Sequence, residues 1–208
     1  FLSALRRLDA DYIVIDLGAG TSYNTVDFFL LADSQLMVVI PEPTSIENAY
    51  RFIKNSFFRQ IFHNSQNFGL KSVVTPILRK DNPYNVNTPK ELINYLNKLG
   101  GSTTVFIEEQ LQLFNPKIIL NQVRTERDQL VGPAMKTACS KYFNLNMKFT
   151  GNISEDESVR KSVLDRKPLA VAYPDGVPMQ QLKSICANIL QEETERSAKN
   201  NLLSQLAL

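Results

Sequence analysis

The sequence contains no tryptophan, only two cysteines and a single histidine among its 208 residues. Cys139 and Cys186 stand in neither a metal-binding nor a redox spacing, so we expect two reduced thiols in a cytoplasmic protein. His63 alone makes neither a metal site nor a catalytic triad, and we interpret it as structural. This scarcity argues against a disulfide scaffold and against a histidine-based centre.

Long hydrophobic runs and a large excess of one charge are also missing. No apolar stretch reaches the ~20 residues that cross a bilayer, and no segment has the pattern of a signal peptide. The net charge of +2 is too small to indicate binding to nucleic acid or to an anionic membrane. Hydrophobic residues make up 43% of the chain, which is ordinary for a globular protein. We therefore expect one domain over residues 1–208.

The opening residues 1–8 place apolar side chains at helical spacing with no capping residue before them. A chain that starts inside a helix is expected to be a fragment of a longer protein.

Short apolar runs alternate with amphipathic segments along the whole chain. The helix signals include a capping box at Thr88 and, after Glu155, a helix in which Val159 and Val163 are expected to face inward. Leu169 to Tyr173 is expected to be extended. This alternation predicts an α/β fold with a mainly parallel sheet flanked by helices. The predicted strands are 11–17, 35–40, 116–123 and 146–153, and the segment 64–115 reads as a helical insertion.

Ligands of open α/β sheets bind at the carboxyl ends of the strands. Asp16 ends the first predicted strand, and a carboxylate there is costly unless it meets a cation or hydrogen-bond donors. Gly18 and Gly20 would let the following turn approach a phosphate. Tyr23 stands where a dinucleotide fingerprint needs a third glycine, which argues against NAD. An ordinary turn, in which Asp16 accepts backbone hydrogen bonds, explains the same residues equally well.

Two further strand ends carry candidate residues. The side-chain amide of Asn121 has both the donor and the acceptor that adenine recognition needs, although a role in shaping the turn is the simpler interpretation. Ser154, Glu155 and Asp156 open a helix, where acidic residues are favoured by the helix dipole alone. Spacing therefore leaves a binding role for these residues open.

Four segments together resemble the MinD/ParA family of P-loop ATPases, especially its branch of flagellar-number regulators. Their order and spacing suit the C-terminal part of that fold, so the fold would be P-loop NTPase-like and incomplete at the N-terminus. The segments are DYIVIDLGAGTS (11–22), VVIPEPTSIENAYRFIK (38–54), IILNQVR (118–124) and GNISEDESVRKSVLDRKPLAVAYPD (151–175).

The resemblance implies ATP and Mg²⁺ as cofactors of the intact protein. Asp16 would hold Mg²⁺ through a water molecule, Gly20 would sense the γ-phosphate from the turn that also contains Gly18, and Asn121 would contact adenine. The resemblance also implies a homodimer that forms when ATP binds, and a partner protein that speeds hydrolysis. The base pocket would be lined by Ser154, Glu155 and Asp156.

No G-x-x-x-x-G-K-[ST] loop, nor the lysine-rich variant of that family, occurs in these residues. Because this loop holds the β- and γ-phosphates, we expect it upstream of Phe1 in the intact protein. The intact protein is then expected to be an ATPase, whereas this chain would bind ATP poorly and contain no catalytic residue.

Three functions follow as hypotheses. The first is an ATP-dependent dimerisation switch that positions flagella, division sites or DNA. The second is a non-catalytic interaction scaffold with the same fold. The third is a ParA-like DNA-partition ATPase, although nothing in the sequence itself supports binding to DNA or to a membrane.

Overall fold

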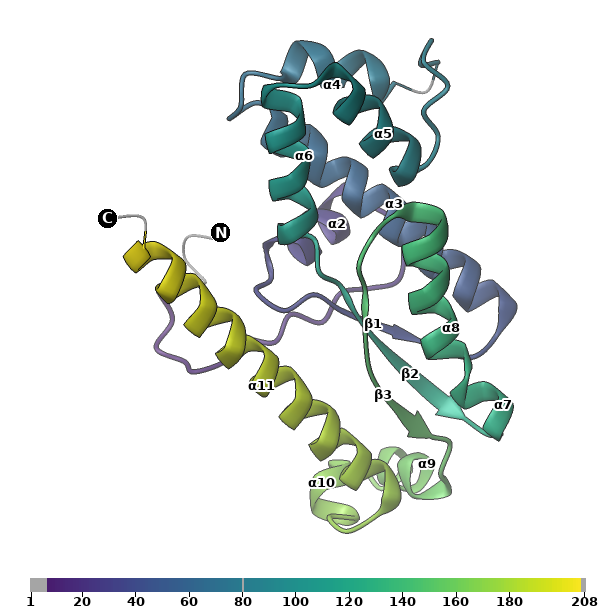
Figure 1. Cartoon of the computed structure of the whole chain (residues 1–208). Coiled ribbons are helices and arrows are strands. Elements are labelled where there is room, and N and C mark those ends of the chain that lie inside the picture. Colours follow the sequence, from purple (N-terminus) through teal and green to yellow (C-terminus); the bar gives the residue numbers. More distant parts are fainter. Residues whose placement is uncertain (1–6, 80, 207–208) are drawn as a thin grey trace.

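A computed structural model describes residues 7–79 and 81–206 of the chain. Its sheet has three parallel strands in the order β1–β2–β3. These strands are β1 (Leu36–Val39), β2 (Lys117–Val123) and β3 (Lys148–Ser154). Helices connect and cover them, so the predicted α/β fold with a parallel sheet flanked by helices is confirmed (Figure 1).

The pairing of β2 with β3 contains an irregularity. Phe149 pairs with Ile118, but the next paired residue, Gly151, stands opposite Ile119, so the strand gains one residue between the two pairs. The ring of Phe149 packs against Gly132 of helix α8 (Val131–Ala138), and Gly151 lies against helix α11 (Val177–Leu206). Phe149 and Gly151 of β3 therefore lie against different helices.

Helix α3 (Pro43–Ser65) carries the largest part of the core. Its residues Ala49, Ile53, Phe57 and Ile61 recur at helical spacing in the sequence, and all four are buried. Helix α2 (Tyr23–Leu31) packs beside it and buries Val26 and Phe29. Thr21 and Ser22 are both residue types that can cap this helix, and in the structure the hydroxyl of Ser22 accepts the first-turn hydrogen bond from the backbone N–H of Thr25.

The predicted insertion is helical in the structure. It contains α4 (Lys71–Ile77), α5 (Pro89–Leu99) and α6 (Ser102–Leu113), which gather at the upper end of the molecule in Figure 1. The capping box of Thr88 and Glu91 is present. Helix α4 was not predicted, because Pro76 lies inside it and polar residues precede it. Figure 1 shows this helical group at the opposite end of the molecule from α7 (Glu126–Gln129), α9 (Glu157–Leu164) and α10 (Leu169–Ala172).

The prediction of a strand over 11–17 is wrong. Residues 12–18 have no regular secondary structure and pair with no strand in the described part of the chain. Tyr12 and Val14 are 73% and 91% exposed. Strand preference reflects packing in a sheet, so an apolar run without a neighbouring strand cannot form a ladder. Only Leu17 packs against the core.

Four other expectations need correction. Leu169–Ala172 forms the short helix α10, not an extended segment. Helix α9 (Glu157–Leu164) exists as predicted, but Val163 is 71% exposed and Val159 36% exposed, while Ser162 is buried. The sequence predicts one helix over 129–143, but the helical region begins earlier and is divided into α7 (Glu126–Gln129), α8 and the π-helix η1 (Cys139–Phe143). It also predicts Thr44 or Ser45 as the cap of α3, whereas α3 begins at Pro43 without a side-chain cap.

Candidate functional site

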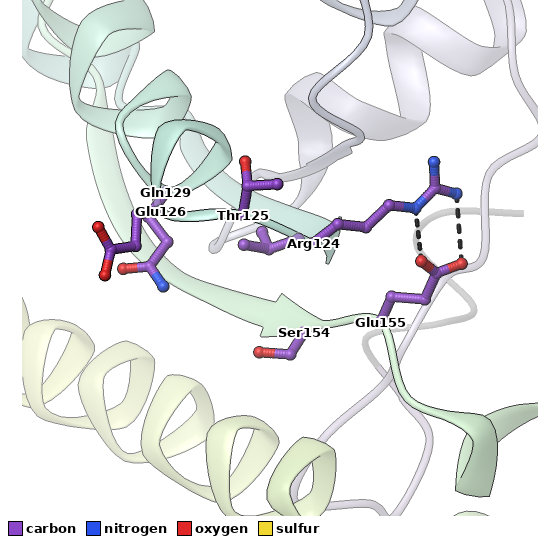
Figure 2. Close-up of a pocket in the computed structure, with 7 residues that line it drawn as sticks. Arg124, Thr125, Glu126, Gln129, Ser154 and Glu155 are labelled. Carbon is purple, nitrogen blue, oxygen red and sulfur yellow. Dashed lines mark hydrogen bonds and ion pairs between the residues drawn. The ribbon is translucent and has the colours of Figure 1, made fainter.

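The carboxyl ends of β2 and β3 lie side by side and enclose an open cavity of about 380 Å³. The loop after β2, helix α7 and the end of β3 provide its walls (Figure 2). This is the position at which parallel α/β sheets bind their ligands. The lining residues are Val123, Arg124, Thr125, Glu126, Gln129, Ser154 and Glu155.

An ion pair closes one side of this cavity. Arg124 donates from Nε and Nη2 to the two carboxylate oxygens of Glu155, at 2.5 and 3.2 Å (Figure 2). The hydrogen bonds and the charge of Glu155 raise the pKa of Arg124, and the carboxylates of Glu42 and Asp128 act in the same direction. Glu42 follows β1, so charged residues from the ends of all three strands meet at this edge of the sheet.

Gln181 of helix α11 holds Ser154 in place through two hydrogen bonds. The backbone N–H of Ser154 donates to Oε1 of Gln181 at 2.8 Å, and Nε2 of Gln181 donates to the Ser154 hydroxyl at 2.9 Å. Both bonds are partly buried, and together they fix the position of Ser154 at the end of β3. The hydroxyl still has its own proton to donate to a ligand.

A capping box fixes the opposite wall. Asp128 accepts hydrogen bonds from the backbone N–H groups of Arg124 and Thr125 at 2.9 and 2.8 Å, and these bonds lower its pKa. The Thr125 hydroxyl in turn accepts from the N–H of Asp128. Figure 2 shows Glu126 and Gln129 on this side of the cavity, away from the ion pair.

The sequence interpretation missed Arg124, Thr125, Glu126 and Gln129 as site residues. One signal for them was present, since Thr125 and Asp128 have the spacing of a capping box, which would have placed a helix directly after β2. No pattern in the sequence indicates the pairing of Arg124 with Glu155, because 31 positions separate the two residues.

Of the predicted base-contacting residues, Ser154 and Glu155 line the cavity, whereas Asn121 and Asp156 do not. The side-chain oxygen of Asn121 accepts from the backbone N–H of Gln122 at 2.9 Å, where Gln122 adopts a φ of 56°. Asp156 accepts from the N–H of Ser158 and is the N-cap of α9. Both residues therefore shape local backbone, which was the simpler interpretation of each.

The segment from Asp16 to Gly20 contributes no lining residue to this cavity. Asp16 is exposed and takes part in none of the hydrogen bonds and ion pairs found within residues 7–79 and 81–206. Gly20 has a φ of 127°, which favours glycine, and a Cβ atom added at Gly18 or Gly20 would meet no neighbour within 4 Å.

Within the described residues, no three or more His, Cys, Asp or Glu side chains are grouped so that they could hold a metal ion. Mg²⁺ can be bound through one carboxylate, water molecules and the phosphates of a nucleotide, so a single acid such as Asp16 still fits its chemistry. None of the helices in the same residues is both long enough and apolar enough to cross a membrane.

No protein-family model matches this sequence, and no curated protein matches it.

Proposed function

We propose that the cavity between the ends of β2 and β3 binds the nucleoside part of ATP, and that the chain is part of a MinD/ParA-like, ATP-dependent dimerisation switch. The supporting observation is that Ser154 and Glu155, which the family resemblance assigns to the base, line one cavity together with Arg124 and Gln129. A volume of about 380 Å³ lies in the range of small-molecule sites.

The lining favours a base or a sugar over a phosphate. Two carboxylates, Glu126 and Glu155, stand against one arginine, and that arginine is already paired with Glu155. An incoming phosphate would face repulsion from both acids. The hydroxyl of Ser154 and the amide of Gln129 offer the neutral donors and acceptors that suit a purine edge or a ribose hydroxyl.

In this proposal the phosphates and Mg²⁺ lie outside the cavity. Mg²⁺, when bound, would neutralise phosphate charge, and the Asp16 carboxylate would hold it. The 208 residues contain no lysine-bearing phosphate-binding loop, so this chain would bind ATP weakly, mainly through the nucleoside.

Photolabelling tests this proposal directly. The base of 8-azido-ATP carries the reactive group, so irradiation of the chain with this probe should label residues 123–129 and 154–155, as read by mass spectrometry. Excess ATP should suppress the labelling. Labelling that is scattered over the surface, or that ATP does not suppress, would refute the nucleoside site.

The alternative function, a non-catalytic interaction scaffold, has one observation of its own. Helix α9, which follows β3 in the sequence, exposes Val163 and Leu164, which are 71% and 64% accessible. Exposed aliphatic side chains of this kind are typical of protein-binding surfaces. A chain that binds no adenine nucleotide at any concentration, but associates through this helix, would favour the scaffold.

A further inference from the structure

Helix α11 lies along β3 in the opposite direction, and one stripe of its side chains meets the strand (Figure 1). Gln181 reaches Ser154 at the end of β3. Glu192, eleven positions later in the helix, reaches Lys148 at the start of β3. The stripe consists of Gln181, Ile185, Asn188 and Glu192. Spacings of three and four positions keep these side chains on one side of a helix. Helix α11 therefore spans β3 from the end that borders the cavity to the end farthest from it.

Most contacts of this stripe are polar. Nδ2 of Asn188 donates to the carbonyl of Thr150 at 3.1 Å, and Nζ of Lys148 lies 3.1 Å from Oε2 of Glu192. The buried ammonium group of Lys117, on β2, lies 4.0 Å from the same oxygen. The carboxylate of Glu192 therefore stands between two ammonium groups at the start of the sheet. Because polar contacts of this kind weaken steeply when their geometry changes, they fix one position of α11 along β3.

Ile185 is the point about which α11 can tilt. Its side chain is 3% exposed and packs on Gly151, where an added Cβ atom would lie 2.8 Å from it. At a rise of 1.5 Å per residue, Ile185 is about 6 Å from Gln181 and about 10 Å from Glu192. A shift of about 1 Å at Glu192 therefore moves Gln181 by roughly 0.6 Å in the opposite direction. The two bonds to Ser154, at 2.8 and 2.9 Å, would then reach the limit of hydrogen bonding.

We propose that Glu192 and Lys148 are positioning residues for Ser154 and, through Ser154, for the nucleoside site. Their ion pair at the far end of β3 fixes the tilt of α11, and α11 holds Ser154 through Gln181. Neither member of the ion pair lines the cavity, so its effect on a ligand passes through the helix. The identity of the ligand rests on the proposed function, whereas the effect on Ser154 is measured without a ligand.

Ligand binding in the cavity and the docking of α11 then support each other. If docking of the helix favours the ligand, the ligand favours docking by the same factor, because coupling between two binding events is reciprocal. Adenosine should therefore slow hydrogen exchange in residues 185–192 of α11, which line no part of the cavity.

Hydrogen exchange of the Ser154 amide in the ligand-free chain tests the positioning. This amide donates to Gln181, so its protection reports the docking of α11 beside the cavity. Lys148→Met removes the ion pair from a side chain that is 44% exposed, so the variant should fold. It should speed the exchange of Ser154 by about two- to tenfold, the effect of one such contact on an equilibrium. Lys148→Arg, which keeps the charge, should exchange like the unaltered chain.

A second pair of variants removes a charge from α11 itself. Glu192→Gln should also speed the exchange of Ser154. Glu195→Gln is the matched control, because Glu195 is exposed and accepts its hydrogen bond from Gln191 of the same helix. Each change neutralises one carboxylate of α11, so a general effect of helix charge would appear in both. In NMR titrations, Lys148→Met and Glu192→Gln should raise the Kd for adenosine by a similar factor, about two- to tenfold.

Unchanged exchange of Ser154 in both Lys148→Met and Glu192→Gln, or equal acceleration in Glu192→Gln and Glu195→Gln, would overturn the inference. If adenosine still binds the unaltered chain, the nucleoside site then stands without this coupling. If adenosine does not bind but Ser154 responds to loss of the far ion pair, the nucleoside proposal fails and the positioning of Ser154 by α11 is upheld.

Discussion

Replacing Gln181 with methionine should destabilise the end of β3 at the candidate site. Methionine keeps the length of the side chain but removes the bond from the Ser154 N–H and the bond to the Ser154 hydroxyl. Each such hydrogen bond contributes about 0.5–1.5 kcal/mol net, so the variant should lose roughly 1–3 kcal/mol of unfolding free energy. Urea denaturation followed by circular dichroism measures this loss.

The neighbouring Gln180→Met is the matched control, because Gln180 makes a single exposed hydrogen bond to the carbonyl of Asp175. That variant should remain within about 0.5 kcal/mol of the unaltered protein. Hydrogen exchange adds a local readout, since the amide proton of Ser154 should exchange faster only in Gln181→Met. Equal stability of the two variants, or unchanged protection of Ser154, would refute the role assigned to Gln181.

Three further predictions follow from the same structure. Gly132→Ala should destabilise the protein by about 1–3 kcal/mol in denaturant titrations, because the added Cβ would lie 2.2 Å from an aromatic carbon of β3, whereas Gly18→Ala should be nearly neutral. Asp27→Asn should flatten the acid limb of the stability curve measured from pH 6 downward. The hydrogen bond from Arg59 holds the pKa of Asp27 below its ordinary value of 3.8, so this contribution is complete above that value and is lost as the pH falls through the lower folded-state pKa. Asn121→Ala should cost no more than about 1 kcal/mol of stability, since its one hydrogen bond is local. A calorimetric titration of the intact protein with ATP then shows whether Asn121 also contacts the base.

The sequence was informative where a segment's structure depends on its own residues. β1, β2 and β3 were found because apolar runs bounded by turn residues mark strands covered on both faces. The start of α5 was found because Thr88 and Glu91 cap it within four positions. The same reasoning failed for residues 11–17, because a strand needs a neighbouring strand and the sequence of one segment contains no information about that neighbour.

The site was predictable only in part, for the same physical reason. Ser154 and Glu155 were predicted because they lie at the end of a strand, and the end of β3 borders the cavity. Arg124 and Gln181 could not be named, because each acts through a partner far away in the sequence. The spacing of Val159 and Val163 showed correctly that they share one side of a helix, but it could not tell whether that side faces the core or solvent.

The central claim, a nucleoside site between the ends of β2 and β3, is tested most directly by an NMR titration of the chain with adenosine and, separately, with inorganic triphosphate. Adenosine should shift the backbone amides of residues 123–129 and 154–157, and inorganic triphosphate should leave them unmoved. Shifts caused by inorganic triphosphate alone, or no shift at saturating adenosine, would contradict the account.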